Sequence, residues 1–149
     1  MSNQPTDINV DQGWFLAQKT AAIRAKKLET DCRIKTLEGK LCFKAGMILC
    51  KGSFNDLWAQ QEAQFQKKFV CISPSQDQDG WKEYAPVPEQ CRVWAKQMDH
   101  DFIVETVHGT LYGNKGDYWI KQWTPIYTSD LPKQWIVKQT IFEKTYEKL

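Results

Sequence analysis

Residues 25–51 read AKKLETDCRIKTLEGKLCFKAGMILCK, and residues 95–121 read AKQMDHDFIVETVHGTLYGNKGDYWIK. The two stretches align without a gap at a shift of 70 residues, and eight of the 27 aligned positions are identical. Unrelated segments of ordinary composition would share about two. Self-similarity at a fixed period indicates a repeated structural unit, so these two stretches decide the predicted fold.

The similarity continues downstream, after an insertion of seven residues that follows the second stretch. Trp58 then aligns with Trp135, and Phe65 aligns with Phe142. The segment between the two stretches carries Ser, Gln, Asp, Gly and three Pro, which are typical of turns and linkers. The predicted organisation is one compact domain made of an N-terminal arm (1–19), a degenerate first repeat (20–70), a linker (71–90) and a second repeat (91–149).

The two repeats agree on which side chains are buried. Successive residues of a strand point to opposite faces of a sheet. Ile23 and Ala25 are apolar, as are the aligned Val93 and Ala95, while the position between them is basic in one repeat and apolar in the other. This alternation predicts a strand from about residue 22 onward rather than an amphipathic helix over residues 14–28.

The end of the chain predicts a helix. The spacing of Thr140 and Glu143 is that of a capping box. Phe142, Tyr146 and Leu149 follow at helical spacing and would form one apolar stripe. The predicted fold class is therefore α+β and β-rich: two tandem repeats of a small antiparallel β unit of three or four strands, each closed by a short helix and packed with pseudo-twofold symmetry.

Composition excludes several classes of protein. The 149 residues carry 20 Lys and Arg against 18 Asp and Glu, a net charge of +2 that disfavours nucleic-acid binding. No apolar run approaches the roughly 18 residues that span a bilayer, and the N-terminus lacks the pattern of a signal peptide. The five cysteines are an odd number without a C-x-x-C pair, which predicts reduced thiols in a cytoplasmic protein, with no metal and no cofactor.

Three short motifs resemble a known family. These are Thr-Leu-Glu-Gly at 36–39, Lys-Gly-Asp-Tyr at 115–118 and Ile-Phe-Glu-Lys-Thr-Tyr-Glu at 141–147. They are similar to the PGDYG family of bacterial and phage-associated proteins, whose members resemble a single copy of the repeat, and the second repeat is the closer one. The sequence departs from the family at Lys115, where the family has Pro, and at Met47 and Ile48, which align with Asp117 and Tyr118. Because the family is functionally uncharacterised, the resemblance implies a fold and no activity.

The Gly116-Asp117-Tyr118 triplet has two interpretations. Glycine takes positive φ at low cost, and an Asp after it accepts backbone N–H bonds, so the triplet fits a turn that leads Tyr118 into a strand. The first repeat keeps the Gly and lacks the Asp, which favours this structural interpretation. In the functional interpretation, Asp117 faces a cleft and binds the donor groups of a ligand.

Histidines and unmatched aromatics are the other candidates. His100 and His108 fall at expected turns, and neither has the spacing of a metal or triad motif. Trp94 and Trp119 occur only in the second repeat. They would fill the seam between the repeats or, with Tyr112 and Tyr127, form a stacking platform for a ligand.

The sequence thus predicts a non-enzymatic binding or regulatory module whose unknown partner, a small molecule or a protein, sits at the seam beside residues 113–131. The predicted ligand-binding residues are Asp117, Tyr118, Trp119, His108, Trp94, Tyr112 and Tyr127. No catalytic residue is assigned, and changes at Asp117 and Trp119 are expected to abolish binding without unfolding the chain. The alternatives are a small hydrolase or transferase that uses Asp117 and His108, and a structural phage or assembly component. The oligomeric state stays open.

Overall fold

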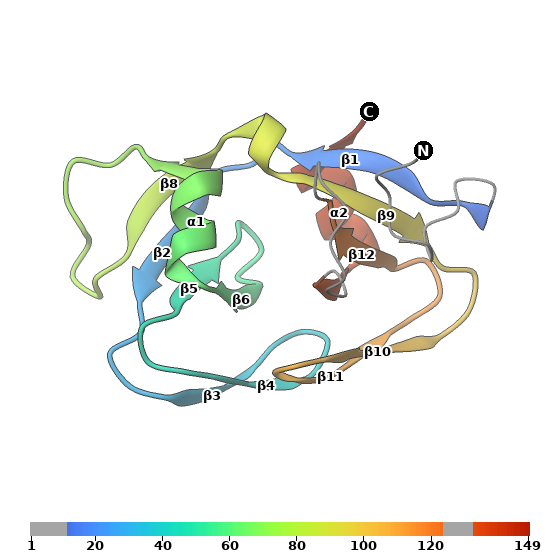
Figure 1. Cartoon of the computed structure of the whole chain (residues 1–149), viewed down its shortest axis with the longest axis horizontal. Helices are drawn as coiled ribbons and strands as arrows, with labels where there is room; N and C mark the ends of the chain where they lie inside the picture. Colours follow the sequence, from blue (N-terminus) through green and yellow to red (C-terminus); the bar gives the residue numbers. More distant parts are fainter. Residues whose placement is uncertain (1–11, 124–132) are drawn as a thin grey trace.

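The computed structural model describes residues 12–123 and 133–149. These residues form two five-stranded antiparallel sheets, two two-stranded hairpins and two short helices (Figure 1). The β-rich α+β class predicted from the sequence is confirmed. Each sheet has more strands than the three or four expected of one repeat.

One sheet, called sheet A, has the strand order β13-β12-β9-β1-β14. The helix α2 (Gln139–Thr145) packs on it through Phe142. The strands are β1 (Phe15–Lys19), β9 (Arg92–Gln97), β12 (Tyr118–Gln122), β13 (Gln134–Val137) and β14 (Tyr146–Lys148).

The other sheet, called sheet B, has the order β6-β5-β2-β8-β7. The helix α1 (Glu62–Lys68) packs on it through Phe65. Its strands are β2 (Ile23–Lys27), β5 (Ile48–Lys51), β6 (Leu57–Gln60), β7 (Phe69–Cys71) and β8 (Lys82–Pro86). The strand predicted from about residue 22 onward is confirmed as β2.

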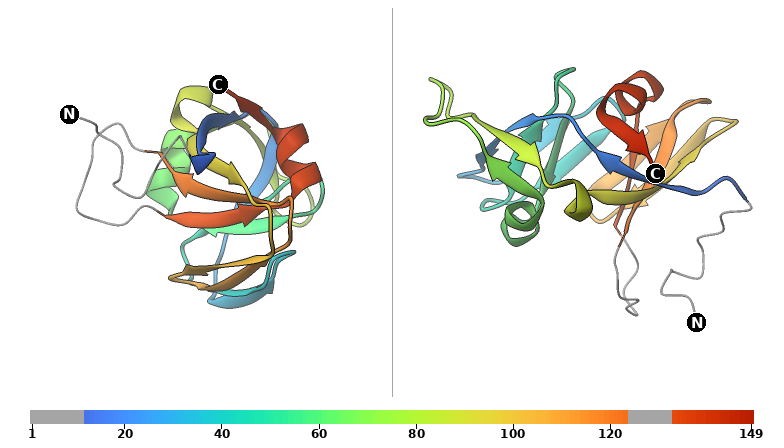
Figure 2. Two further views of the ribbon diagram at one scale, coloured as in Figure 1. Left: turned by 90° about the vertical axis from the view of Figure 1, so that its right-hand side faces the viewer. Right: turned by 90° about the horizontal axis from the view of Figure 1, so that it is seen from above.

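The two sheets exchange one strand each. β1 directly precedes β2 in the chain, yet it pairs with β9 and β14 of sheet A. Likewise β8 precedes β9, yet it pairs with β2 and β7 of sheet B. The connection from β1 to β2 therefore crosses from one half of the molecule to the other (Figure 2). Part of the expected arm forms β1, and part of the expected linker forms β8 and a short 3-10 helix at Pro88–Gln90.

Two hairpins lie side by side on one flank of the molecule (Figure 1). They are β3 (Cys32–Lys35) with β4 (Lys40–Phe43), and β10 (Phe102–Thr106) with β11 (Gly109–Gly113). The Cys42 amide donates to the His108 carbonyl at 3.0 Å, and the Tyr112 amide donates to the Glu38 carbonyl at 2.8 Å. Gly109 has φ +143°, and a Cβ there would lie 2.8 Å from the Lys40 carbonyl oxygen, so glycine is needed for this close approach.

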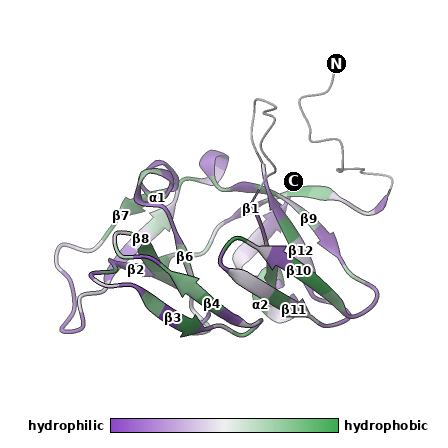
Figure 3. Cartoon of the chain, turned by 60° about the horizontal axis from the view of Figure 1, so that its bottom comes forward, coloured by the Kyte–Doolittle hydropathy of each residue, from purple (hydrophilic) through white to green (hydrophobic). Residues whose placement is uncertain are grey.

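Apolar side chains form one core on each sheet, and a further core lies between the sheets and the hairpins. Ile23, Ala25 and Phe65 belong to the core of sheet B. Val104 and Leu111 of the second hairpin belong to the core between the sheets and the hairpins. Figure 3 shows hydrophobic residues along the strands of both halves and hydrophilic residues in the outlying loop between β7 and β8.

The helix α2 differs from the predicted one at both ends. The N-cap residue is Lys138, whose side chain makes no capping hydrogen bond, and the helix begins at Gln139. The capping box expected at Thr140 is therefore wrong. The helix ends at Thr145 because Tyr146 begins β14, which pairs with β1. Tyr146 is therefore a strand residue and does not extend a helical stripe.

Candidate functional site

A cavity of about 440 Å³ lies in the middle of the molecule. Both halves line it: β6 and α1 of sheet B contribute on one side, and β13 and α2 of sheet A contribute on the other. The turns of both hairpins line it as well, through Glu38 and His108. Cavities of roughly 300–1,000 Å³ at the junction of two substructures are common ligand sites.

The walls of the cavity are largely apolar and aromatic. Trp58, Trp135 and Tyr146 line it, and Phe43 and Met47 of the core between the sheets and the hairpins line it too. Burial raises the pKa of the Tyr146 hydroxyl. Such walls suit a flat apolar molecule because aromatic rings provide large contact areas at a low cost in side-chain entropy.

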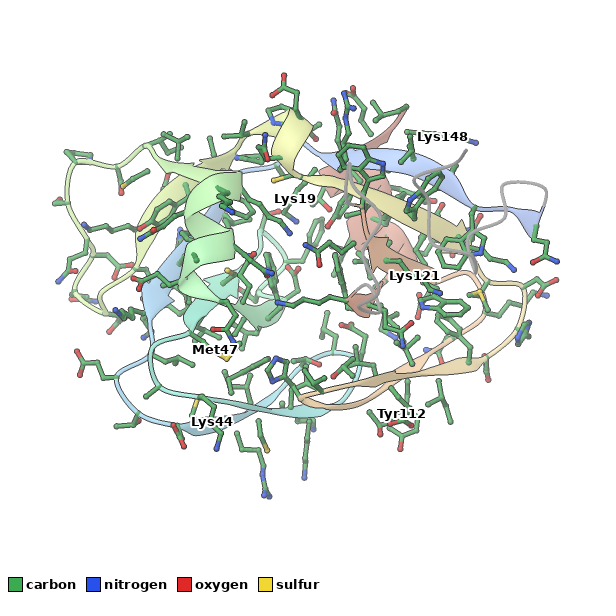
Figure 4. All side chains as sticks on the ribbon, in the orientation of Figure 1. Lys19, Lys44, Met47, Tyr112, Lys121 and Lys148 are labelled. Atoms are coloured by element: carbon green, nitrogen blue, oxygen red, sulfur yellow. The ribbon has the colours of Figure 1, made fainter. Side chains whose placement is uncertain are left out.

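Lys19 is a charged residue at a core position. It follows Phe15 and Ala17 at alternate positions of β1, so its side chain points to the inner face of sheet A. Only 7% of its surface is exposed. Figure 4 places it in the middle of the molecule, between α1 and α2.

The Lys19 ammonium lies between two aromatic rings. Its Nζ is 4.8 Å from the ring centroid of Trp58 and 4.8 Å from that of Tyr146. It donates no hydrogen bond to any residue of 12–123 or 133–149. Burial lowers the pKa of Lys19, and the negative charge of Asp56 opposes this shift. No oxygen of Asp56 lies within 4.0 Å of the Lys19 Nζ, so the two residues do not form an ion pair.

Sheet B has no charge at the corresponding place. Lys19 pairs with Tyr146 of the edge strand in sheet A. In sheet B the same two positions are held by Pro86 and Phe69. Apolar residues can therefore pack at this point of such a sheet, and the packing of sheet A does not require an ammonium group there.

Two further lysines, Lys68 and Lys133, line the cavity. The Lys19 amide donates to the Cys91 carbonyl at 3.4 Å, and the Cys91 thiol donates to the Lys68 carbonyl at 3.2 Å. Burial is the largest cause that lowers the pKa of Lys68, and the charge of Lys133 lowers it further. The Lys133 ammonium donates to the Gln64 amide oxygen at 2.7 Å. Lys19, Lys68 and Lys133 thus all line the cavity.

Acidic groups line the cavity as well: Glu38, Asp56 and Glu105. Burial raises the pKa of Glu38 to about 7. Asp56 lies in the turn between β5 and β6, where its carboxylate occupies the space that a side chain at Gly52 would need. One Asp56 oxygen, Oδ1, is buried and has no hydrogen-bond partner among the described residues.

Of the predicted site residues that the structure describes, His108 alone lines the cavity. Its ring lies 5.1 Å from the ring of Phe43, and burial lowers its pKa. The Thr106 hydroxyl accepts from the His108 amide at 3.1 Å and donates to the Gly109 carbonyl at 2.7 Å. Thr36 makes the same bonds around Glu38, so these motifs build the hairpin turns that carry Glu38 and His108 to the cavity.

Asp117 has a structural position and does not line the cavity. Its carboxylate accepts hydrogen bonds from the amides of Asn114 at 2.9 Å and Gln139 at 3.1 Å, and from the Lys138 ammonium at 2.9 Å. Only 6% of its surface is exposed. The Asp therefore closes the turn before β12 and holds the first amide of α2. Tyr118 is buried beside it, with its ring stacked on Phe142 at 3.9 Å.

The remaining predicted residues lie elsewhere. Trp94 is buried with Trp14 in a cluster on the face of sheet A that is opposite to the α2 face. Trp119 packs on the same cluster, 5.0 Å from the Trp14 ring, and its indole N–H donates to Gln134 at 3.1 Å. Tyr112 is exposed on the outside of the hairpins, and Tyr127 lies outside the described residues.

The predicted set is therefore not brought together, and Lys19 is the residue that sequence reasoning missed. The signal for it was the alternation Phe15, Ala17, Lys19, which places the Lys on the apolar face of a strand. That signal is hidden when residues 1–19 are taken as an arm.

No helix among the described residues is long and apolar enough to cross a membrane. Residues 12–123 and 133–149 contain no group of three or more His, Cys, Asp or Glu side chains placed to hold a metal ion. The five cysteines are all free thiols. No family model, no curated protein and no solved structure matches the chain.

Proposed function

We propose that the protein is a binding module that holds a small molecule in its central cavity. The observation that carries the proposal is the Lys19 ammonium, which is 7% exposed, lines the cavity and donates no hydrogen bond within the described residues. A buried charge without a hydrogen-bonding partner is costly. A ligand that fills the cavity and supplies acceptor oxygens offsets that cost.

The lining supports binding more than catalysis. Aromatic and aliphatic walls with a few polar groups are typical of ligand pockets. The enzyme alternative relies on Asp117 as a reactive group, and that carboxylate is fully engaged by two amides and the Lys138 ammonium. A general base must reach the proton that it abstracts, and the Asp117 oxygens are occupied by these protein donors.

We also propose that the chain is a duplicated unit with pseudo-twofold symmetry, in which the cavity lies at the junction of the two copies. β3 and β10 begin 70 residues apart, at Cys32 and Phe102, and β6 and β13 begin 77 residues apart, at Leu57 and Gln134. The order of elements from β2 to β7 repeats from β9 to β14. The exchange of β1 and β8 is reciprocal, as are the hydrogen bonds between the hairpins.

A neutral fluorescent probe tests whether the cavity binds. N-phenyl-1-naphthylamine is apolar and becomes strongly fluorescent when it leaves water. We expect it to bind the protein with a stoichiometry of about one, because the walls of the cavity are apolar. Ala59 lines the cavity from β6, so Ala59→Phe is expected to fill part of it and weaken binding at least tenfold.

The matched control is Ala63→Phe, the same change on the exposed side of α1. This variant is expected to bind the probe like the wild type. Absence of binding by the wild type, or equal binding by the Ala59→Phe and Ala63→Phe variants, would refute the proposal.

A further inference from the structure

We propose that the ligand of the central cavity is a small organic anion with a flat apolar body, whose anionic group binds the Lys19 ammonium between Trp58 and Tyr146. This inference rests on the proposed function and specifies the chemical class of the ligand.

The charges at this end of the cavity favour an anion. Lys19 and Lys68 both line it, and neither ammonium donates a hydrogen bond to a described residue. Cys91 bonds to the backbone of both, so the two residues are neighbours. Asp56 is the acidic group that acts on Lys19, and it lies beyond ion-pair distance. The Lys19 ammonium donates no hydrogen bond within the described residues, so it can donate one to a carboxylate or phosphate oxygen of a ligand.

The acidic residues of the lining do not make a matching site for a cation. The Oδ1 atom of Asp56 is buried, and the Glu105 carboxylate accepts a hydrogen bond from the Thr110 hydroxyl at 2.8 Å. Glu38 has a pKa raised to about 7 by its burial, which reduces its negative charge at neutral pH. Among the described residues, the lining holds the four lysines Lys19, Lys68, Lys133 and Lys138 against the three acids Glu38, Asp56 and Glu105. This balance favours a ligand of negative charge over an amine or a zwitterion.

The aromatic rings fix where the anionic group sits. Trp58 and Tyr146 hold the Lys19 Nζ at 4.8 Å from each ring centroid, which restricts the ammonium to the space between them. Trp135 lines the cavity beside Tyr146 and provides a further indole surface. A flat apolar body has aromatic surface to pack against once its anionic group has reached Lys19.

Titration with a matched series of probes tests the inference. 2-Naphthoate carries the anion, 2-naphthamide has nearly the same shape without charge, and 2-naphthylmethylamine carries a cation. We expect 2-naphthoate to bind at least tenfold more tightly than the amide, and the amine to bind most weakly, as measured by isothermal titration calorimetry. Inorganic phosphate at the same concentration is expected to leave 2-naphthoate bound.

Variants assign the preference to the lysines. Lys19→Met keeps an unbranched side chain of nearly the same length and removes the charge, so its affinities for the naphthoate and the amide are expected to become equal. Lys68→Met provides a second variant and is expected to reduce the preference in part. Lys44→Met is the control, since Lys44 is 80% exposed on the hairpin and does not line the cavity. It is expected to keep the full preference.

Each outcome separates the two proposals. Equal binding of 2-naphthoate and 2-naphthamide by the wild type overturns this inference and leaves the binding module standing. An undiminished preference in both lysine variants also overturns it. Displacement of 2-naphthoate by inorganic phosphate would show a site for a bare anion and would overturn the role of the aromatic body. Failure of the neutral probe as well as all three naphthalenes overturns both proposals.

Discussion

Replacement of Asp117 by Ala is expected to destabilise the fold strongly. The change removes the acceptor for the amides of Asn114 and Gln139 and for the Lys138 ammonium. Breaking a buried ion pair by removal of one partner costs about 3–5 kcal/mol. Hydrogen bonds to a charged group contribute about 1.5–3 kcal/mol each and are not additive. We therefore expect a total loss of about 3–5 kcal/mol, from a stability of about 5–15 kcal/mol for a typical domain.

Thermal and urea unfolding, followed by circular dichroism, measure this loss. Each kcal/mol shifts Tm by roughly 2–4 °C in a chain of this size, so Tm is expected to fall by roughly 6–20 °C. The control is Asp101→Ala, because Asp101 is exposed and accepts one hydrogen bond, from the Lys115 amide at 2.9 Å. That change is expected to cost about 1 kcal/mol or less. Equal stability of the two variants would refute the structural role given to Asp117.

Three further outcomes follow from the burial and geometry of particular residues. Glu38 holds its proton more tightly in the folded protein, with a pKa of about 7 against an ordinary 4.5, so the free energy of unfolding should fall as pH rises between these values. Glu38→Gln should remove that part of the pH dependence in urea titrations. Gly109→Ala should lower Tm more than Gly46→Ala, because a Cβ at Gly109 meets the Lys40 carbonyl and one at Gly46 meets nothing within 4 Å. Cys42 and Cys71 are exposed and should react with Ellman's reagent well before the two buried thiols.

Periodicity explains why much of the fold was predictable. Ile23 and Ala25 alternate with basic residues, and the structure places both in the core of sheet B. Thr36 and Thr106 stand three residues before a Gly, and the structure makes each a hairpin turn. These signals are local, since each one depends on the side chains of a single strand or turn.

The exchange of β1 and β8 has no such local signal. Strand partners are set by contacts between distant residues, and Phe15–Lys19 gives no indication that it pairs with β9 and not with β2. The short edge strand β14 was missed for the same reason, because Tyr146 has the spacing of a helical stripe and pairs instead with Lys19. The seven-residue length of α2 follows from this pairing.

The site expected at a seam between two repeats, beside residues 113–131, stays a prediction. The described cavity lies between the two sheets, and of residues 113–123 it is lined by Gln122 alone. Comparison of the repeats directed attention to residues present only in the second one, such as Asp117 and Trp119. In the structure Asp117 accepts hydrogen bonds that hold a turn and α2, and Trp119 packs on the cluster of Trp14 and Trp94. The buried ammonium of the cavity belongs to Lys19, which precedes the aligned region.

A crystal structure of the protein with 2-naphthoate tests the central claim most directly. We predict one naphthoate in the cavity, with a carboxylate oxygen about 2.7–2.9 Å from the Lys19 Nζ, as expected of a charge-assisted hydrogen bond. We predict its rings in contact with Trp58 or Trp135. A naphthoate bound outside the cavity, for example on the cluster of Trp14 and Trp94, with only water beside Lys19, would contradict the account.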